Sequence, residues 1–209
     1  FGNMFLKVCK RFLFFLLSLS ILIAIICGIL YATSNIVMIK KVEVQTVPYH
    51  DIQIVQLSDF NNKVVKGLAE KVNEQNPDIV TGDLVDKYKT NTNNEDVLLK
   101  QFEKIKAPIY FVPGDMEYGY RNYEKLKTKM QEKEIHILEN ATETIQINNE
   151  DIDITGIVDS SAYYEDLEKF NDQLRSLKTT NPQILLSHRP ELINLYAENG
   201  YEFVLCGHT

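Results

Sequence analysis

The chain has 209 residues, enough for one domain of ordinary size, and 44% of them are hydrophobic, as in a globular protein. Its formal net charge is −7 and it contains no basic stripe, which argues against nucleic-acid binding through phosphate neutralisation. An acidic balance does not exclude a small anionic substrate, because a bound divalent cation reverses the local potential.

The N-terminal segment has the composition of a membrane span. Residues 12–32 carry no charged side chain over about 21 positions, enough to cross a hydrocarbon core of roughly 30 Å. This run is longer than the apolar core of a signal peptide, roughly 7–15 residues, so we predict an uncleaved signal anchor. A cleaved signal peptide is the alternative, because residues 32–34 are small. The predicted divisions are a cytoplasmic tail (1–11), a transmembrane anchor (12–32), a linker (33–41) and a folded domain (42–209).

Basic residues on either side of the span predict its orientation. Lys7, Lys10 and Arg11 precede it, whereas only Lys40 and Lys41 follow closely. Because the flank richer in Lys and Arg stays in the cytoplasm, we predict a single-pass membrane protein whose folded domain is extracytoplasmic.

Segments with helical and strand-like spacing of apolar residues alternate through the folded domain. Helical spacing occurs at about residues 64–72, 97–105, 123–130, 165–178 and 190–199. Isoleucines alternate with polar residues over 144–157, which predicts a β-hairpin. Residues 87–96 are polar and turn-rich, so we expect an exposed loop there. Strands that alternate with helices imply a mostly parallel sheet, and the hairpin implies a mixed region.

Five apolar runs share one ending, in which a Gly or Ser is followed by an acidic residue or a histidine. The five endings are Ser58-Asp59, Gly82-Asp83, Gly114-Asp115, Ser187-His188 and Gly207-His208. This pattern is typical of a sheet that builds a site along the carboxyl ends of its strands. Divalent metals that activate water for phosphoester cleavage need several such ligands from different loops. The joint pattern therefore predicts metal-assisted phosphoester chemistry.

Each of these residues also has a structural interpretation. Asp59 could cap a helix, and Asp83 and Asp115 could be ordinary turn residues. His188 could be a hydrogen-bonded structural histidine, and His208 could belong to a frayed end.

The order of these motifs resembles the calcineurin-like metallophosphoesterases, especially their membrane-anchored or exported bacterial members. The family order is Asp-x-His, Gly-Asp-x-x-Asp, Gly-Asn-His-Asp/Glu, a strand ending in His, and Gly-His-x-His. The matching segments here are 58–61, 82–86, 114–117, 187–188 and 207–209, and the resemblance covers about residues 42–209. It implies an α/β/β/α sandwich with mixed sheets, preceded by one transmembrane helix. In the family further strands follow the last motif, so we expect an open sheet edge in this chain.

The resemblance also implies the ligands of a dinuclear metal site. They are Asp59, Asn61, Asp83, Asp115, His188 and His208. Asp83 matches the bridging aspartate, Asn61 stands where the family has a histidine, and Asp115 stands where it has an asparagine. One or two divalent ions are implied, with Mn, Mg, Fe or Zn as candidates. The oxygen-rich set around Asn61 favours Mn²⁺, Mg²⁺ or Ca²⁺.

The third motif departs from the family at the proton donor. Met116 replaces the histidine that protonates the leaving group, and a thioether cannot carry that proton. Glu117 could act as a substitute acid if burial favours its protonated form. Tyr118 and Arg121 could bind substrate by aromatic stacking and a guanidinium fork, although a loop leading into a helix is the simpler explanation.

Three functions remain open from the sequence. The first is a membrane-anchored, metal-dependent phosphoester hydrolase that acts on a phosphorylated small molecule or a lipid-linked phosphate. The second is a catalytically impaired relative that binds metal or phosphate and regulates or scaffolds, which Asn61 and Met116 favour. The third is an ordinary doubly wound domain that binds no metal. The expected partners include the bilayer, through residues 12–32, and exclude nucleic acid.

Overall fold

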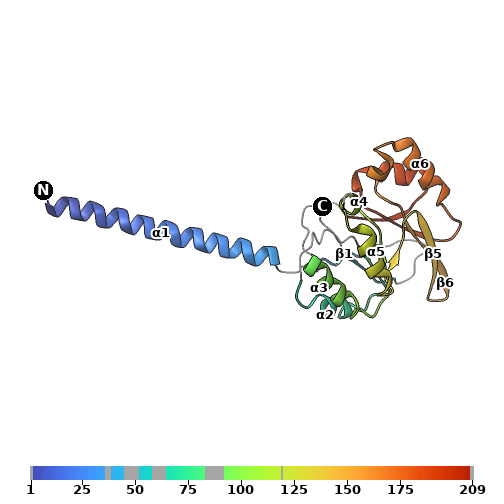
Figure 1. The fold of residues 1–209 in the computed structure, drawn as a ribbon, viewed down its shortest axis with the longest axis horizontal. Helices are drawn as coiled ribbons and strands as arrows, with labels where there is room; N and C mark the ends of the chain where they lie inside the picture. Colours follow the sequence, from blue (N-terminus) through green and yellow to red (C-terminus); the bar gives the residue numbers. More distant parts are fainter. Residues whose placement is uncertain are drawn as a thin grey trace. The chain divides into compact units, whose positions relative to one another are not determined.

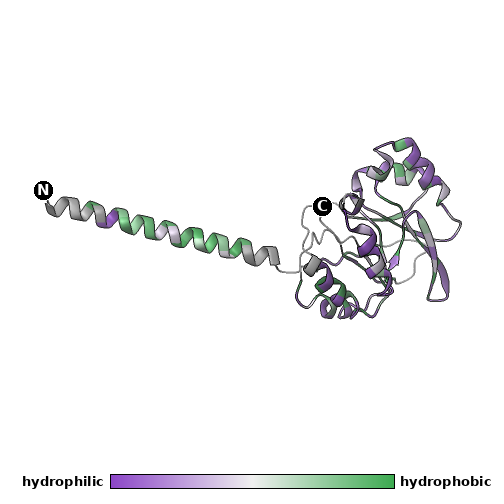
Figure 2. Ribbon diagram, viewed as in Figure 1, coloured by the Kyte–Doolittle hydropathy of each residue, from purple (hydrophilic) through white to green (hydrophobic). Residues whose placement is uncertain are grey.

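A computed structural model describes residues 2–35, 39–44, 52–57, 65–82, 92–118 and 120–207. The chain divides into two compact units, residues 1–42 and 43–209. The first unit contains helix α1 (Gly2–Asn35), whose apolar middle is seen in Figure 2. Residues 10–30 of this helix have a mean hydropathy of 3.0 and are long and apolar enough to cross a membrane. A signal sequence meets the same criteria of length and composition.

The second unit begins with a parallel sheet of four strands (Figure 1). They are β1 (Ile54–Leu57), β2 (Ile79–Gly82), β3 (Ile109–Phe111) and β4 (His136–Ile137), in the order β1-β2-β3-β4. The connections contain α2 (Leu68–Asn73), α3 (Thr92–Phe102), α4 (Asp115–Tyr118) and α5 (Tyr123–Gln131). Parallel strands need such crossover connections, which explains the alternation seen in the sequence.

The following four strands form a mixed sheet. They are β5 (Ala141–Ile147), β6 (Glu150–Gly156), β7 (Gln183–Ser187) and β8 (Phe203–Cys206), in that order. β5 and β6 are the antiparallel hairpin expected from the alternating isoleucines, and β6, β7 and β8 are parallel. Asn148 and Asn149 turn the hairpin with φ of 53° and 66°, as a two-residue type I′ turn requires. The later connections contain η1 (Ser160–Tyr163), α6 (Leu167–Ser176), η2 (Pro190–Leu192) and α7 (Ile193–Glu198).

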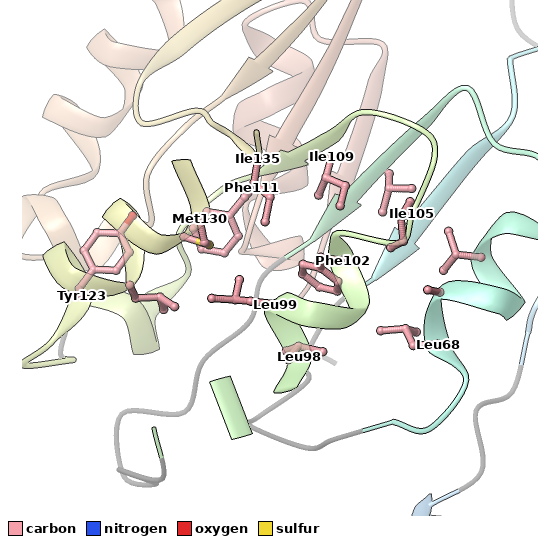
Figure 3. Packing of buried hydrophobic residues seen from close by; sticks show 14 of the residues in the cluster. Leu68, Leu98, Leu99, Phe102, Ile105, Ile109, Phe111, Tyr123, Met130 and Ile135 are labelled. Atoms are coloured by element: carbon pink, nitrogen blue, oxygen red, sulfur yellow. The ribbon is translucent and has the colours of Figure 1, made fainter. Parts of the chain in front are cut away.

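Strand alternation sorts the apolar side chains into three clusters and so creates four layers. Val80 and Phe111 belong to the cluster that the first sheet forms with α2, α3 and α5. Phe111 is labelled in Figure 3 among the side chains of this cluster. Tyr110 lies on the opposite face and packs with Ile154 and Ile184 between the two sheets. On the outer face of the second sheet, a third cluster contains Ile157, Phe170, Leu174, Leu185, Tyr196 and Tyr201. The layers are therefore helix, sheet, sheet and helix, which confirms the predicted α/β/β/α architecture, with mixed pairing in the second sheet alone among the described strands.

Besides this apolar packing, particular contacts hold the two sheets close together. The side-chain amide of Gln56 on β1 donates a hydrogen bond to the backbone carbonyl of Cys206 on β8. At Gly156, where β6 ends, an added Cβ would lie only 2.3 Å from the Cβ and the carbonyl oxygen of Leu138. A side chain at residue 156 would therefore force the sheets apart.

One predicted loop is partly wrong. Helix α3 begins at Thr92, so residues 92–96 are helical, and Glu95 is 6% exposed. The hydroxyl of Tyr120 donates a hydrogen bond to the Glu95 carboxylate, which compensates for its burial. The sequence around Glu95 looks solvent-exposed because its partner lies 25 residues away. Residues 87–91 lie outside the described part of the chain.

Several predicted helices are shorter than the apolar spacing suggests. The helix expected from residue 64 begins at Leu68, because Gly67 adopts a left-handed φ of 74° immediately before it. The one expected over 190–199 is a 3₁₀ turn, η2, followed by α7.

Candidate functional site

The predicted site lies at the carboxyl ends of strands from both sheets. The hydrogen bond between Gln56 and Cys206 brings the ends of β1 and β8 together. Asp115 is the first residue of α4, shortly after β3, and His188 directly follows β7. The other predicted metal ligands, Asp59, Asn61, Asp83 and His208, lie outside the described residues.

Asp115 and His188 come from different sheets and face each other. The Nε2 atom of His188 lies 3.2 Å from Oδ1 of Asp115, and the side chains are 4% and 20% exposed, respectively. The two groups are close enough for an ion pair, but they are not aligned for a hydrogen bond. Oδ1 of Asp115 is therefore a buried oxygen without a hydrogen-bond donor among the described residues.

This pair suits a divalent metal. Carboxylate oxygen and imidazole nitrogen are common ligands of Mn, Fe and Zn, and burying a carboxylate oxygen is costly unless a positive group compensates. Within the described residues, no group of three or more His, Cys, Asp or Glu side chains could hold a metal ion. Asp115 and His188 thus fit part of a metal site, and the complete ligand set remains a prediction.

Gly114 allows the imidazole of His188 to approach the backbone. A Cβ at this position would lie 2.9 Å from Nδ1 and 3.0 Å from two ring carbons of His188. Any side chain here would displace the ring or the loop that carries Asp115.

Glu117 has a structural partner at the start of α4. Its Oε2 accepts a hydrogen bond of 2.9 Å from the backbone N–H of Gly114, and the residue is 1% exposed. A glutamate at the third helical position that reaches back to the residue before the helix forms half of a capping box. Its carboxylate therefore stabilises the helix that carries Asp115, and its role as an acid remains a prediction.

The segment after α4 is partly structural. Tyr118 is the last residue of α4, and Arg121 is solvent-exposed. Tyr120 and Tyr123 are 4% and 9% exposed and belong to the core. Burial and the hydrogen bond to Glu95 raise the pKa of Tyr120. Arg121 and its neighbour Asn122 are exposed, so Arg121 is accessible to a substrate.

The residue after His188 belongs to a buried ion pair that the sequence did not reveal. Nε and Nη2 of Arg189 donate to the two carboxylate oxygens of Asp159 at 2.7 and 3.0 Å. Oδ1 of Asp159 also accepts the backbone N–H of Ser161 and so caps η1. Burial alone would raise the pKa of Asp159, but the hydrogen bonds from Arg189 and Ser161 outweigh it and hold the pKa below its usual value.

Tyr196 contacts the chain on both sides of His188. Its hydroxyl donates to the carbonyl oxygen of Arg189 at 2.7 Å and lies 2.8 Å from Oγ of Ser187. Because a phenol has one proton, Ser187 is the donor to Tyr196. Burial raises the pKa of Tyr196, so this proton stays in place.

A local sequence signal was available for only part of this network. Asp159 precedes Ser160-Ser161, and an acidic residue before such a run is a helix-cap signal. Arg189 and Tyr196 give no comparable signal, because the partner of Arg189 lies 30 residues away.

Comparisons with known proteins agree with this architecture. The sequence pattern of the family described as calcineurin-like phosphoesterase matches residues 51–209. An uncharacterized metallophosphoesterase of Campylobacter jejuni is 29% identical over 207 residues, which cover 90% of this chain and 53% of the relative. The chain thus spans about half the length of the curated relative that it matches.

A solved structure shares the fold at low sequence identity. One crystal structure superposes with a TM-score of 0.53 and 12% identity, covering 75% of this chain and 84% of the other. The structure of a novel archaeal phosphodiesterase covers the same shares with 15% identity, but its TM-score of 0.39 is too low to support a conclusion.

Proposed function

This chain belongs to the calcineurin-like phosphoesterase family, and from that premise we propose that it is a membrane-anchored, metal-dependent phosphoester hydrolase. The observation that carries the proposal is the convergence of Asp115 and His188 from two sheets, with a buried carboxylate oxygen that lacks a hydrogen-bond donor among the described residues. An ordinary turn aspartate would be solvated or hydrogen-bonded.

The proposed site holds one or two divalent ions. The proposed ligands are Asp59, Asn61, Asp83, Asp115, His188 and His208, with Asp83 as the shared carboxylate. When bound, the ions supply a water nucleophile of lowered pKa and neutralise charge on the phosphoryl oxygens. The chain itself would orient Asp115 through α4 and His188 through β7, and His188 is 4% exposed.

The proposed substrate is a phosphorylated small molecule or a lipid-linked phosphate. Arg121 is exposed just after α4, where a guanidinium fork can pair with phosphate oxygens. Glu117 is the proposed proton donor to the leaving group, and Tyr118 a proposed substrate contact. Bound divalent ions would attract an anionic substrate and so offset the repulsion from the net charge of −7.

Helix α1 is the proposed membrane anchor, with the catalytic domain outside the cytoplasm. The apolar segment 10–30 supports the anchor, and the excess of basic residues before it supports the orientation. Protease digestion of spheroplasts tests the orientation: we expect loss of the domain from intact spheroplasts. Protection until lysis would contradict it.

The activity is tested with the whole chain in detergent micelles and an aryl phosphate monoester and diester as substrates. We expect Mn²⁺-dependent hydrolysis that EDTA stops and that Asp83→Ala and His188→Ala each abolish. The matched control is His136→Ala, because His136 lies on β4 and contacts Glu143 rather than Asp115. Hydrolysis that survives both EDTA and His188→Ala would refute the proposal.

A metal- or phosphate-binding relative without catalysis is the second candidate. The hydrogen bond between Glu117 and Gly114 favours it, because a carboxylate that accepts a backbone N–H is held as an acceptor rather than as an acid. Mn²⁺ binding that His188→Ala removes, without turnover of either ester, would identify this function.

A further inference from the structure

We propose that Asp159 is a positioning residue that, through Arg189, holds the imidazole of His188 opposite Asp115. The inference rests on the proposed function, because it assigns His188 to the working site. It concerns two residues, Asp159 and Arg189, that lie outside the predicted ligand set.

Asp159 and Arg189 are joined by two hydrogen bonds. Both carboxylate oxygens of Asp159 accept from Arg189, and the Asp159 side chain is fully buried. A two-point contact between planar groups fixes direction as well as distance. Since Arg189 follows His188 in the chain, the direction of one side chain constrains the backbone that carries the other.

The backbone on either side of His188 is also held in place. Tyr196 holds Ser187 and the carbonyl of Arg189 through its hydroxyl, and it is fully buried against the second sheet. The chain at His188 is thus fixed by α7 through Tyr196 and by η1 through Asp159. Little rotational freedom remains for the peptide that bears the imidazole.

Asp159 is also linked to the helix that carries Asp115. Asp159 caps η1 by accepting the N–H of Ser161, and η1 packs against α4. Helix α4 begins with Asp115. The Asp159 carboxylate therefore binds the η1 turn, which contacts the helix of Asp115, and it also binds Arg189, which follows His188. Through these two contacts it sets the distance between Asp115 and His188.

A gain in stability alone does not explain the Asp159–Arg189 ion pair well. A buried ion pair is often no more stabilising than apolar residues of similar volume, because desolvation offsets the attraction. In some proteins a buried ion pair instead favours one packing arrangement of the chain over its alternatives. Glu165 and Glu191 also lie near Arg189, at 3.5 and 3.4 Å, so each nitrogen of its guanidinium faces an acidic group.

The variants that test the proposal are Asp159→Asn and Arg189→Lys in the whole chain in detergent micelles. Lysine keeps the charge of Arg189 but loses the two-point contact. The matched control is Asp153→Asn, because Asp153 is also a buried aspartate (3% exposed), lies on β6 and accepts hydrogen bonds from Thr144 and Asn181. Its partners do not include His188 or Arg189.

Three quantities are measured for each variant: the Mn²⁺ dissociation constant, the Tm in EDTA, and the imidazole ¹H–¹⁵N signals of the metal-free protein. His188→Gln identifies the His188 signal. We expect Asp159→Asn and Arg189→Lys to weaken Mn²⁺ binding about 10–100-fold, as for residues that orient a ligand. The double variant should be no worse than either single one, because both remove the same contact.

The control separates positioning from loss of stability. Asp153→Asn should lower the Tm but leave Mn²⁺ affinity within about twofold and the His188 signal unchanged. Equal loss of affinity in Asp153→Asn and Asp159→Asn would overturn the proposal, as would unchanged affinity in Asp159→Asn.

Failure of the proposed function has a different signature. If the unsubstituted chain binds no Mn²⁺, metal dependence is refuted, and the His188 signal still decides the positioning role. A shift or broadening of that signal in Asp159→Asn and Arg189→Lys, but not in Asp153→Asn, supports positioning. An unchanged signal in both refutes it.

Discussion

The imidazole of His188 lies against the backbone of Gly114 and occupies the space that a side chain at position 114 would need. The ring atoms of His188 lie 2.9–3.0 Å from where a Cβ would stand, and the ring is held by its own buried surroundings. The requirement for glycine at this position is therefore steric and is set by a residue of the other sheet.

Gly114→Ala should displace the His188 ring and weaken Mn²⁺ binding about tenfold or more, since ligand placement is sensitive to small shifts. The affinity is measured by titration calorimetry. The control is Gly67→Ala: Gly67 has a left-handed φ of 74°, but among the described residues an added Cβ there would meet only Glu70, at 3.9 Å. The control should cost about 1–2 kcal/mol of stability through backbone strain and leave the affinity intact. Equal losses of affinity would contradict the steric argument.

Glu117 combines a structural contact with a proposed chemical role, and one substitution separates them. Glu117→Gln keeps an acceptor for the N–H of Gly114, because glutamine also serves in a capping box. We therefore expect a nearly unchanged Tm. If Glu117 protonates the leaving group, the rate should fall about 10²–10⁴-fold and the dependence of rate on pH should change.

The matched control is Glu124→Gln, an exposed glutamate in the first turn of α5. It should change neither rate nor Tm. A rate–pH profile of Glu117→Gln that coincides with that of the unsubstituted chain would leave Glu117 with the capping role alone.

At the scale of elements, one buried carboxylate connects the hairpin to the start of β7. Asp153 on β6 accepts hydrogen bonds from Thr144 on β5 at 2.7 Å and from Asn181 at 3.2 Å. Burial alone would raise its pKa, but these hydrogen bonds outweigh burial and hold the pKa below the ordinary value of 3.8. A carboxylate with a lowered folded-state pKa stabilises the fold above its unfolded pKa, and this contribution is lost as the pH falls through the folded value.

Asp153→Asn should therefore destabilise the domain most at neutral pH. The difference in free energy of unfolding from the unsubstituted chain should shrink as the pH falls below 3.8. Denaturant unfolding between about pH 2.5 and pH 7 measures it. Asp151→Asn is the control, because Asp151 is exposed on the same strand and should give a small difference. A pH-independent difference for Asp153→Asn would exclude the carboxylate as its cause.

At the scale of the whole molecule, helix α1 and the phosphoesterase domain are separate compact units. Within its own unit, α1 leaves large apolar side chains such as Phe14 and Ile23 exposed, at 75% and 53%. A helix that is apolar on all sides is typical of a membrane span. The anchoring role therefore predicts a response to charge that depends on depth.

Ile23→Lys should reduce retention in carbonate-washed membranes, because a lysine near the centre of a span costs about 2.5–3.5 kcal/mol. Val8→Lys is the control, since Val8 lies before the apolar segment and a lysine there can reach the interface. Equal retention of both variants would argue against a membrane-spanning α1.

The sequence by itself determined the elements whose signals are local. Alternating isoleucines identified the β5–β6 hairpin, helical spacing identified α5 almost to the residue, and the uncharged run identified α1. The hairpin and α5 were predictable because periods of about two and 3.6 residues report which face of an element is buried, and α1 because its apolar run is long enough to span a bilayer. The order of strand-end acids and histidines was enough to indicate the family and its four-layer fold.

The tertiary structure alone decided which side chains meet. Asp115 faces His188 across two sheets, Gly114 makes room for that ring, and Asp159 binds Arg189 from 30 residues away. A contact of the same kind, from Tyr120, satisfies the buried carboxylate of Glu95 in a segment whose polar residues suggested an exposed loop. Contacts between residues far apart in the chain leave no periodic trace, because each depends on how separate layers pack and not on the spacing within any one of them.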